Sequence, residues 1–297
     1  MPSIIQFFHP GGEHRPDSDC KTYKSWNMGA HKRKFMKSKG TYIENGKEKK
    51  GELLFWGEWE PPSNVEKLLI KTEPPKYLHS PLLPSQNKIK KYQREGYANT
   101  DPFIFGDCFK YAICMQESRP SLKNLEDGSL ILFGSRVNFR FVIDTVFVVK
   151  RSQEYTTPVG SRFSNLGLYP ELSLKMGETN CGNNQHSTRR LYFGATVKDH
   201  ADGMYSFVPA QKSTSENQGF PRISMPLDFY SDKNKKINRY FSEWKNGKDG
   251  ITEGQNAGIK STIADIKDIK CLWEYIKRTV IQQKYLPGVH FEMPVCQ

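Results

Sequence analysis

The sequence predicts an α+β protein with a curled mixed sheet or small barrel, flanking helices and a long amphipathic helix near the C-terminus. Two observations predict this class. Strand-length runs of apolar and β-branched residues, separated by turns, follow one another across residues 101–151, and a single long run at helical spacing comes near the end. With 297 residues, the chain has a size that one large domain can fill, so 1–297 is expected to be one domain.

Residues 1–100 form the basic part of the chain, and the regular elements expected there are short. They are strands at 3–8, 52–59 and 66–72 and a basic helix at 86–95. The proline-rich segment 74–84 predicts a loop, and Gly96 is well placed to end the helix that follows it.

Residues 101–151 are expected to form the β core. Apolar and polar residues alternate over 109–116, which is typical of a half-buried strand. A turn at 125–129 leads into the apolar run 130–134, and a long strand is expected at 139–150.

Residues 152–297 combine strands with helices. A strand is expected at 191–197, and the apolar residues of 237–244 fit one face of a helix that Gly247 ends. The longest helix is expected to begin with Thr262 as N-cap and to continue to 280, before Pro287-Gly288.

The charge of the chain indicates a nucleic-acid partner. Its 44 Lys and Arg exceed its 32 Asp and Glu, which gives a net charge of +12. The excess is steepest between Lys21 and Lys50, where ten Lys or Arg face two Glu. Such an excess is typical of proteins that bind the phosphate backbone, and a basic but inert surface is the alternative.

The sequence also predicts where the protein is found. No stretch approaches the roughly 20 apolar residues that a membrane span requires, and the N-terminus lacks the basic region and cleavage site of an export signal. Six cysteines are scattered without a Cys-x-x-Cys pair, so they are expected to be reduced thiols. These features favour a cytoplasmic protein with no membrane partner and no evident obligate protein partner.

The most unusual short segment is His9-Pro-Gly-Gly-Glu-His14, directly after the first expected strand. Glycines let the backbone approach a ligand closely, and His9, Glu13 and His14 offer an acid, a base or metal ligands. The spacing is one residue too long for the zinc motif His-x-x-Glu-His, and Pro-Gly-Gly would break the helix that this motif needs. An ordinary solvated turn is the alternative.

A second segment, from Trp26 to Phe35, interleaves aromatic and cationic residues. The side chains expected to contact a nucleic acid here are Trp26, Asn27, His31, Lys32, Arg33 and Lys34. The three consecutive cations would hold phosphates while an aromatic ring stacks on a base. The segment is not a Walker loop because it lacks the glycine spacing and the Ser or Thr after Lys. A solvated charge run beside core aromatics explains the pattern equally well.

Carboxylates beside apolar residues are the remaining candidates. Trp56 and Trp59 could form a slot for an extruded base, with Glu58 or Glu60 at its edge, although core tryptophans are the commoner outcome. Burial raises the pKa of a carboxyl group, which makes Asp107 and Asp144 candidate acids or bases. For Asp144, a bond to a neighbouring backbone group is the favoured alternative.

The pattern Gly128-Ser-Leu-Ile-Leu-Phe-Gly-Ser135 followed by Phe141-Val-Ile-Asp-Thr-Val-Phe147 resembles the small barrels of PUA, ASCH and EVE type that recognise modified nucleotides. It covers about a sixth of the chain. Together with the His9–His14 segment and the basic N-terminal third, it also resembles bacterial nucleotide-modification-associated proteins of phage defence. One activity in that group is a DNA glycosylase that excises glucosylated hydroxymethylcytosine. The resemblance implies a PUA-like barrel and a modified-DNA substrate, and it assigns no catalytic residue.

The leading hypothesis is an antiphage enzyme that extrudes a modified base from DNA and hydrolyses its N-glycosidic bond. The oxocarbenium-like sugar of such a reaction needs a nearby carboxylate. The candidates, in order, are Glu13, Asp107 and Glu58, assisted by His9 and His14, with no metal or other cofactor. The alternatives are a non-catalytic reader of modified bases and a metal-dependent nuclease that uses His9, Glu13 and His14.

Overall fold

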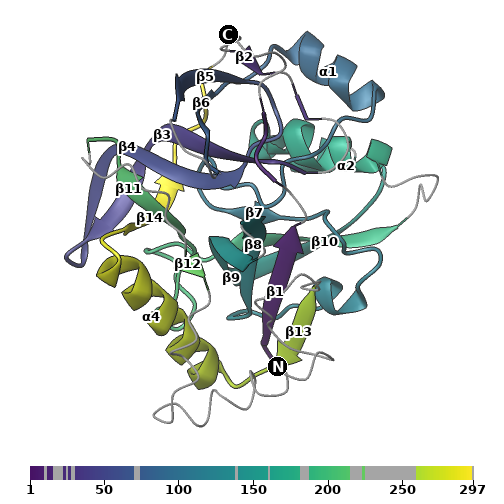
Figure 1. Cartoon of the computed structure of the whole chain (residues 1–297). Helices are drawn as coiled ribbons and strands as arrows, with labels where there is room; N and C mark the ends of the chain where they lie inside the picture. Colours follow the sequence, from purple (N-terminus) through teal and green to yellow (C-terminus); the bar gives the residue numbers. More distant parts are fainter. Residues whose placement is uncertain are drawn as a thin grey trace.

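The protein is an α+β fold built around two mixed sheets, as the sequence predicts (Figure 1). The computed structural model describes residues 1–9, 12–15, 23–24, 26–27, 31–69, 74–137, 140–159, 161–180, 187–214, 223–224 and 259–295. Within these residues each sheet has seven strands. No helix in the described ranges is long and apolar enough to cross a membrane.

The first sheet has the order β13-β1-β8-β9-β10-β7, with β12 paired to β9. Its strands are β1 (Ser3–His9), β7 (Lys110–Tyr111), β8 (Leu130–Val137), β9 (Arg140–Thr156), β10 (Thr188–Gly194), β12 (Ile223–Ser224) and β13 (Lys260–Ile263). Strand β1 runs parallel to β8 and antiparallel to β13, so the first residues of the chain pair with segments about 130 and 260 residues further on. Figure 1 shows β1 and β13 side by side.

The second sheet has the order β14-β11-β4-β3-β6-β5-β2. Its strands are β2 (Tyr23–Lys24), β3 (Arg33–Glu44), β4 (Lys47–Glu58), β5 (Ser63–Leu68), β6 (Tyr77–Pro81), β11 (Val208–Lys212) and β14 (Leu286–Phe291). Because β14 pairs with β3 as well as with β11, four strands of this sheet close into a small ring. The expected curled mixed sheet is therefore confirmed.

The hairpin of β3 and β4 determines the position of several site residues. Asn45 and Gly46 have φ values of 53° and 73° and form a two-residue turn of the kind that matches the twist of paired strands. The pairing continues without a shift to the far end of both strands, where Arg33 faces Glu58. Each strand has 12 residues, so the expectation of only short elements in residues 1–100 is wrong here.

Among the described residues, three α-helices and three 3-10 or π-helical segments lie outside the sheets. They are α1 (Gln86–Arg94), α2 (Lys175–Asn180), α4 (Ile266–Gln282), η1 (Pro120–Lys123), η2 (Ser161–Leu166) and η3 (Pro170–Leu174). Helix α4 is the expected C-terminal amphipathic helix, and its buried face, which includes Trp273 and Ile276, packs with Ile4 and Leu130 of the first sheet. A larger apolar cluster joins the two sheets, with Phe7 and Phe133 from one and Met36 and Phe55 from the other.

The strand expected over 109–116 is wrong beyond its first residues. Only Lys110–Tyr111 pairs as β7, and the chain then turns, with Met115 at φ 62°. The carboxylate of Asp101 accepts hydrogen bonds from the backbone N–H groups of three successive residues, Ala112, Ile113 and Cys114. These donors are consequently not available for a sheet.

Other boundaries also differ from expectation. The proline-rich segment 74–84 contains strand β6, whose last residue is Pro81. Thr262 lies in β13, and the N-cap of α4 is Asp265, whose side chain accepts from the N–H of Lys267 at 2.8 Å. The expected helix at 237–244 lies outside the described residues.

Candidate functional site

A buried polar network lies where the two sheets meet. Its members come from the ends of strands that converge there: His9 ends β1, Arg33 begins β3, Glu58 ends β4, Asp144 lies in β9, and His31 and Glu60 lie just outside β3 and β4. A second contact joins the sheets beside it, since Trp56 Nε1 donates to Ser135 Oγ at 2.8 Å. The network is therefore held by backbone positions from both sheets.

Arg33 is the centre of this network. Its Nη1 donates to Glu58 Oε2 at 2.6 Å and its Nε donates to Asp144 Oδ2 at 2.7 Å. A third guanidinium nitrogen, Nη2, lies 2.8 Å from His9 Nδ1. The guanidinium is fully buried, so these partners replace the water that it would otherwise bind.

His31 is the most exposed side chain of the network. Its side chain is 23% exposed, whereas those of Glu58 and Glu60 are 1% and 0% exposed. His31 Nδ1 lies 3.1 Å from Glu58 Oε1 and 3.0 Å from Glu60 Oε1. Its ring is parallel to that of His9, with centroids 5.0 Å apart. A ligand that approaches the network therefore meets the His31 imidazole before the carboxylates.

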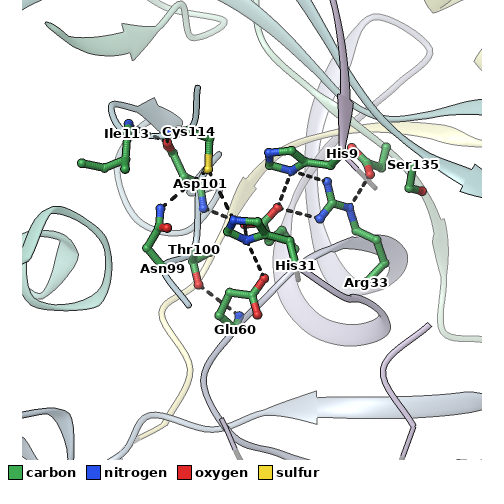
Figure 2. Close-up of polar contacts among 12 residues, drawn as sticks. His9, His31, Arg33, Glu60, Asn99, Thr100, Asp101, Ile113, Cys114 and Ser135 are labelled. Carbon is green, nitrogen blue, oxygen red and sulfur yellow. Dashed lines mark hydrogen bonds and ion pairs between the residues drawn. The ribbon is translucent and has the colours of Figure 1, made fainter. Parts of the chain in front are cut away.

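Residues of the loop around Asp101 form the back of the network. The N–H of Asp101 donates to Glu58 Oε1 at 3.0 Å, and the N–H of Glu60 donates to Thr100 Oγ1 at 3.1 Å. Cys114 Sγ lies 3.7 Å from His31 Nε2 (Figure 2). Burial raises the pKa of Asp101 to about 7, against the effect of its three backbone donors, and raises that of the Cys114 thiol to about 12.

The two histidines of the network have opposite protonation preferences. Burial, partly opposed by Glu58, lowers the pKa of His9 to about 4, so this ring is neutral at pH 7. Burial also disfavours the charged form of His31. The attraction of Glu58, together with the other contacts of the ring, outweighs this effect of burial and raises the pKa of His31. His31 is thus an imidazolium stacked on a neutral imidazole.

The carboxyl groups differ as well. Although burial opposes ionisation of Glu58, the positive charges of His31 and Arg33 and the contact with His9 hold its pKa well below the usual range. Burial raises the pKa of Glu60 and of Asp144. Glu60 Oε2 is buried without a hydrogen-bond partner in the described part of the chain. Glu58 is therefore the fixed anion, and Glu60 is the carboxyl group best suited to exchange a proton.

His31, Glu58 and Glu60 are also the group, among the described residues, whose ligand atoms lie close enough to share a metal ion, within 4.8 Å of one another. Histidine nitrogen and carboxylate oxygen suit Zn²⁺. Both oxygens of Glu58 are already engaged, one by Arg33 and one by the N–H of Asp101, and the guanidinium would repel a second cation. A protonated His31 can donate to the carboxylate oxygens that a metal ion would otherwise bind. The trio is therefore better suited to acid–base chemistry than to metal binding.

The structure separates the residues of the His9–His14 segment. His9 belongs to the network, whereas Glu13 and His14 line a cavity of about 580 Å³ together with Lys32. Glu13 Oε1 accepts from the N–H groups of Lys76 and Tyr77, at 2.5 and 3.0 Å. Burial raises the pKa of Glu13. The trio His9, Glu13 and His14 expected for a metal-dependent nuclease is not among the metal-capable groups of the described residues.

Asp107 lies in a different cavity, of about 330 Å³, which Lys198 and Glu292 also line. Its side chain is 80% exposed and pairs with Lys110 Nζ at 2.7 Å. Burial acts against ionisation of Asp107, but the bond to Lys110 lowers its pKa. The reason for choosing Asp107, an apolar environment that raises its pKa, is therefore wrong.

The structure contradicts the expected aromatic slot and two of the expected phosphate contacts. Trp26, Trp56 and Trp59 are at most 2% exposed, so their ring faces are covered by the core rather than open to a base. Lys34 is also buried and donates to Pro61 O at 2.6 Å. Arg33 is occupied by Glu58 and Asp144, and of the three consecutive cations only Lys32 lines an open cavity.

Asn27 is buried as well, and its N–H donates to the backbone oxygen of Glu60 at 2.9 Å. It supports the segment that carries Glu60 and is not an exposed contact residue. The sequence reasoning assigned His31 to binding rather than to acid–base chemistry, and it missed Asp101 and Cys114.

No protein-family model matches this chain, and neither a curated protein nor a solved structure does. The class of protein is therefore defined by its own fold and site: a basic α+β protein with a buried acid–base network that reaches solvent through one histidine.

Proposed function

We propose that this protein is a DNA N-glycosylase that releases a modified cytosine, hydroxymethylated or glucosylated, and leaves an abasic site. The observation that carries the proposal is the setting of His31, a partly exposed imidazolium whose Nδ1 lies between two buried carboxyl groups. Cleavage of an N-glycosidic bond needs a proton donor for the departing base and negative charge near the oxocarbenium-like sugar. This trio supplies both.

In the proposed reaction, water adds to C1′ as the bond between C1′ and the base nitrogen breaks, and the base leaves with a proton. His31 contacts the substrate and donates that proton. Glu58 and Glu60 lie 3.1 and 3.0 Å from His31 Nδ1, where their charge stabilises the imidazolium and the cationic sugar. Glu60, with a raised pKa and a free oxygen, takes up the proton that the attacking water loses. Arg33 and Asp144 are positioning residues, since they hold Glu58 in place.

The nature of the substrate rests on charge and resemblance. The net charge of +12 favours a polyanionic partner. The choice of a modified base follows from the likeness of residues 128–147 to barrels that recognise modified nucleotides. The choice of a modified cytosine follows from the resemblance of the whole chain to nucleotide-modification-associated proteins of phage defence. Under this proposal the protein acts on DNA inside a bacterial cytoplasm. Free thiols fit that location, and the described cysteines Cys108, Cys114 and Cys271 are all free.

The test incubates the purified protein with DNA that contains cytosine, hydroxymethylcytosine or glucosylated hydroxymethylcytosine. Released bases are quantified by mass spectrometry, and abasic sites by alkaline cleavage. We expect release from modified DNA, and we expect His31→Gln and Glu60→Gln to reduce its rate by at least about 100-fold because a general acid or base contributes at least that much. Glu95→Gln, an exposed carboxylate just after α1, is the matched control and should keep the wild-type rate.

Each result decides between the proposal and its rivals. Release of no base from any of the three DNAs, with binding intact, would overturn the glycosylase and leave a reader of modified bases. Strand breaks without prior loss of a base would indicate a nuclease. The burial of Trp26, Trp56 and Trp59 removes the expected aromatic slot for the glycosylase and the reader alike, so it does not decide between them.

A further inference from the structure

The cavity beside β3 has the features of an anion site. It measures about 580 Å³, and the described residues that line it come from three segments: Gly12, Glu13, His14 and Arg15; Lys32; and Pro74 and Lys76. None of these residues takes part in the proposed cleavage step. The cavity adjoins the network along the chain, because Lys32 lies between His31 and Arg33.

Backbone hydrogen bonds fix the walls of this cavity. Arg33 N donates to Gly12 O at 2.9 Å, and His14 N donates to Arg33 O at 2.8 Å, so the first segment is bound to β3 like a short parallel strand. Glu13 joins the same segment to the third one through the N–H groups of Lys76 and Tyr77. The cavity is therefore formed before a ligand arrives, which reduces the entropy lost on binding.

The charges in the cavity favour an anion. Arg15, Lys32 and Lys76 are cations, and within the described ranges no ion pair involves any of the three. Glu13 is the one carboxylate among the described lining residues, and it accepts from backbone N–H donors, which partly neutralise its charge. The described lining thus has an excess of two positive charges. Lysine and arginine side chains are common contacts of DNA phosphates.

We infer that this cavity binds a backbone phosphate of the DNA strand beside the nucleotide on which His31 acts, with Lys32, Lys76 and Arg15 as its ligands. The inference rests on the proposed function. Lys32 is the chain neighbour of His31, so the cavity that it lines begins beside the segment that carries His31. An enzyme that extrudes a base must hold the flanking backbone, and this cavity is positioned to do so.

The experiment measures binding of a duplex oligonucleotide, containing one glucosylated hydroxymethylcytosine, by fluorescence anisotropy at several salt concentrations. Each phosphate contact adds about 0.9 to the slope of log affinity against log salt. Lys32→Gln and Lys76→Gln should each lower that slope by about 0.9 and weaken binding several-fold. Lys88→Gln on α1, an exposed lysine outside the cavity, is the matched control and should lower neither. Lys76→Arg keeps the charge and should restore binding.

Slopes for both cavity variants that equal the slope of Lys88→Gln would overturn the inference. Circular dichroism and melting temperature identify any variant that fails to fold, and the remaining cavity variant then decides. Failure of the proposed function has a different signature. If the wild type binds the duplex but releases no base, the glycosylase is wrong while the slopes still report on the cavity. If Glu60→Gln abolishes base release but the cavity variants bind normally, only the phosphate site is wrong.

Discussion

The buried network and the cavity use the consecutive residues Arg33 and Lys32 in opposite ways. Arg33 faces the interior, where it contacts two carboxylates and a histidine, whereas Lys32 lines an open cavity with two other cations. Lys34, the next residue, is buried like Arg33 and donates to Pro61 O, so a run of three cations is divided between two structural positions and one that lines the cavity. Consecutive charged residues in a sequence can therefore have different roles.

The largest effect is expected for a variant that disrupts the buried network. Arg33→Met should lower the free energy of unfolding by about 3–5 kcal/mol because it leaves Glu58 and Asp144 buried without their cation. Urea denaturation measures this loss. Lys32→Gln is the control at the neighbouring position, which lines the cavity, and it should change stability by less than about 0.5 kcal/mol. Equal losses in the free energy of unfolding for Arg33→Met and Lys32→Gln would contradict the different roles of these two residues.

The second effect is a dependence of the free energy of unfolding on pH that arises in the buried network. The pKa of His9 falls from 6.5 to about 4 on folding, so between these pH values the unfolded chain binds a proton that the folded protein does not. The contribution of His9 to the free energy of unfolding should therefore decrease as pH falls through this window, by about 3 kcal/mol in total. The raised pKa values of Asp101 and Glu60 have the opposite sign, since they favour the folded protein at low pH.

The difference between two variants isolates the contribution of His9. The stability of His9→Gln relative to wild type should rise as pH falls from 6.5 to 4, whereas the stability of His200→Gln, at an exposed position, should keep a constant difference from wild type. Urea midpoints at pH 7, 5.5 and 4.5 provide the measurement. A slope that persists unchanged in His9→Gln would mean that another group titrates.

Much of the fold could be predicted from the sequence, because strands and helices leave periodic patterns. The strands at 3–8, 130–134 and 139–150 and the C-terminal amphipathic helix are where periodicity places them, with boundaries shifted by a few residues. The pattern failed over 109–116, where side-chain alternation continues while Asp101 binds the backbone donors. Alternation of apolar and polar residues indicates only which side chains are buried. When a distant carboxylate accepts hydrogen bonds from the backbone N–H groups, the sequence of the segment itself does not show it.

The site was harder to predict than the fold because it depends on contacts between distant residues. One of them was within reach: Asn45-Gly46 predicts a two-residue hairpin turn, and counting outward from it pairs Arg33 with Glu58. The contact of Arg33 with Asp144, 111 residues away, depends on how two sheets pack. The tryptophans show the same limit, because an aromatic residue beside charges has the same sequence pattern in a core as in a binding slot.

A smaller effect concerns the cavity walls. Glu13→Ala removes the acceptor for the N–H groups of Lys76 and Tyr77 and should lower the free energy of unfolding by about 1–2 kcal/mol. Glu13→Gln keeps an oxygen acceptor and should recover most of this loss. Because Ala also removes the only carboxylate among the described lining residues, Glu13→Ala should bind duplex DNA no more weakly than wild type if the cavity keeps its shape. Strong loss of binding together with unchanged stability would indicate that Glu13 contacts the ligand itself.

The smallest expected effect tests whether a proton or a metal occupies the space between His31, Glu58 and Glu60. A metal at 100 times its dissociation constant stabilises a folded protein by about 2.7 kcal/mol. With a proton on His31 and Arg33 against Glu58, we expect Zn²⁺ or Mn²⁺ to change the melting temperature of wild type and of His31→Gln equally, and chelators to leave base release unchanged. Stabilisation of the wild type that His31→Gln lacks, with one metal ion per chain by elemental analysis, would replace the acid–base trio by a metal centre. That outcome would also convert His31 from the proton donor into a ligand, and the cleavage step would then need another acid.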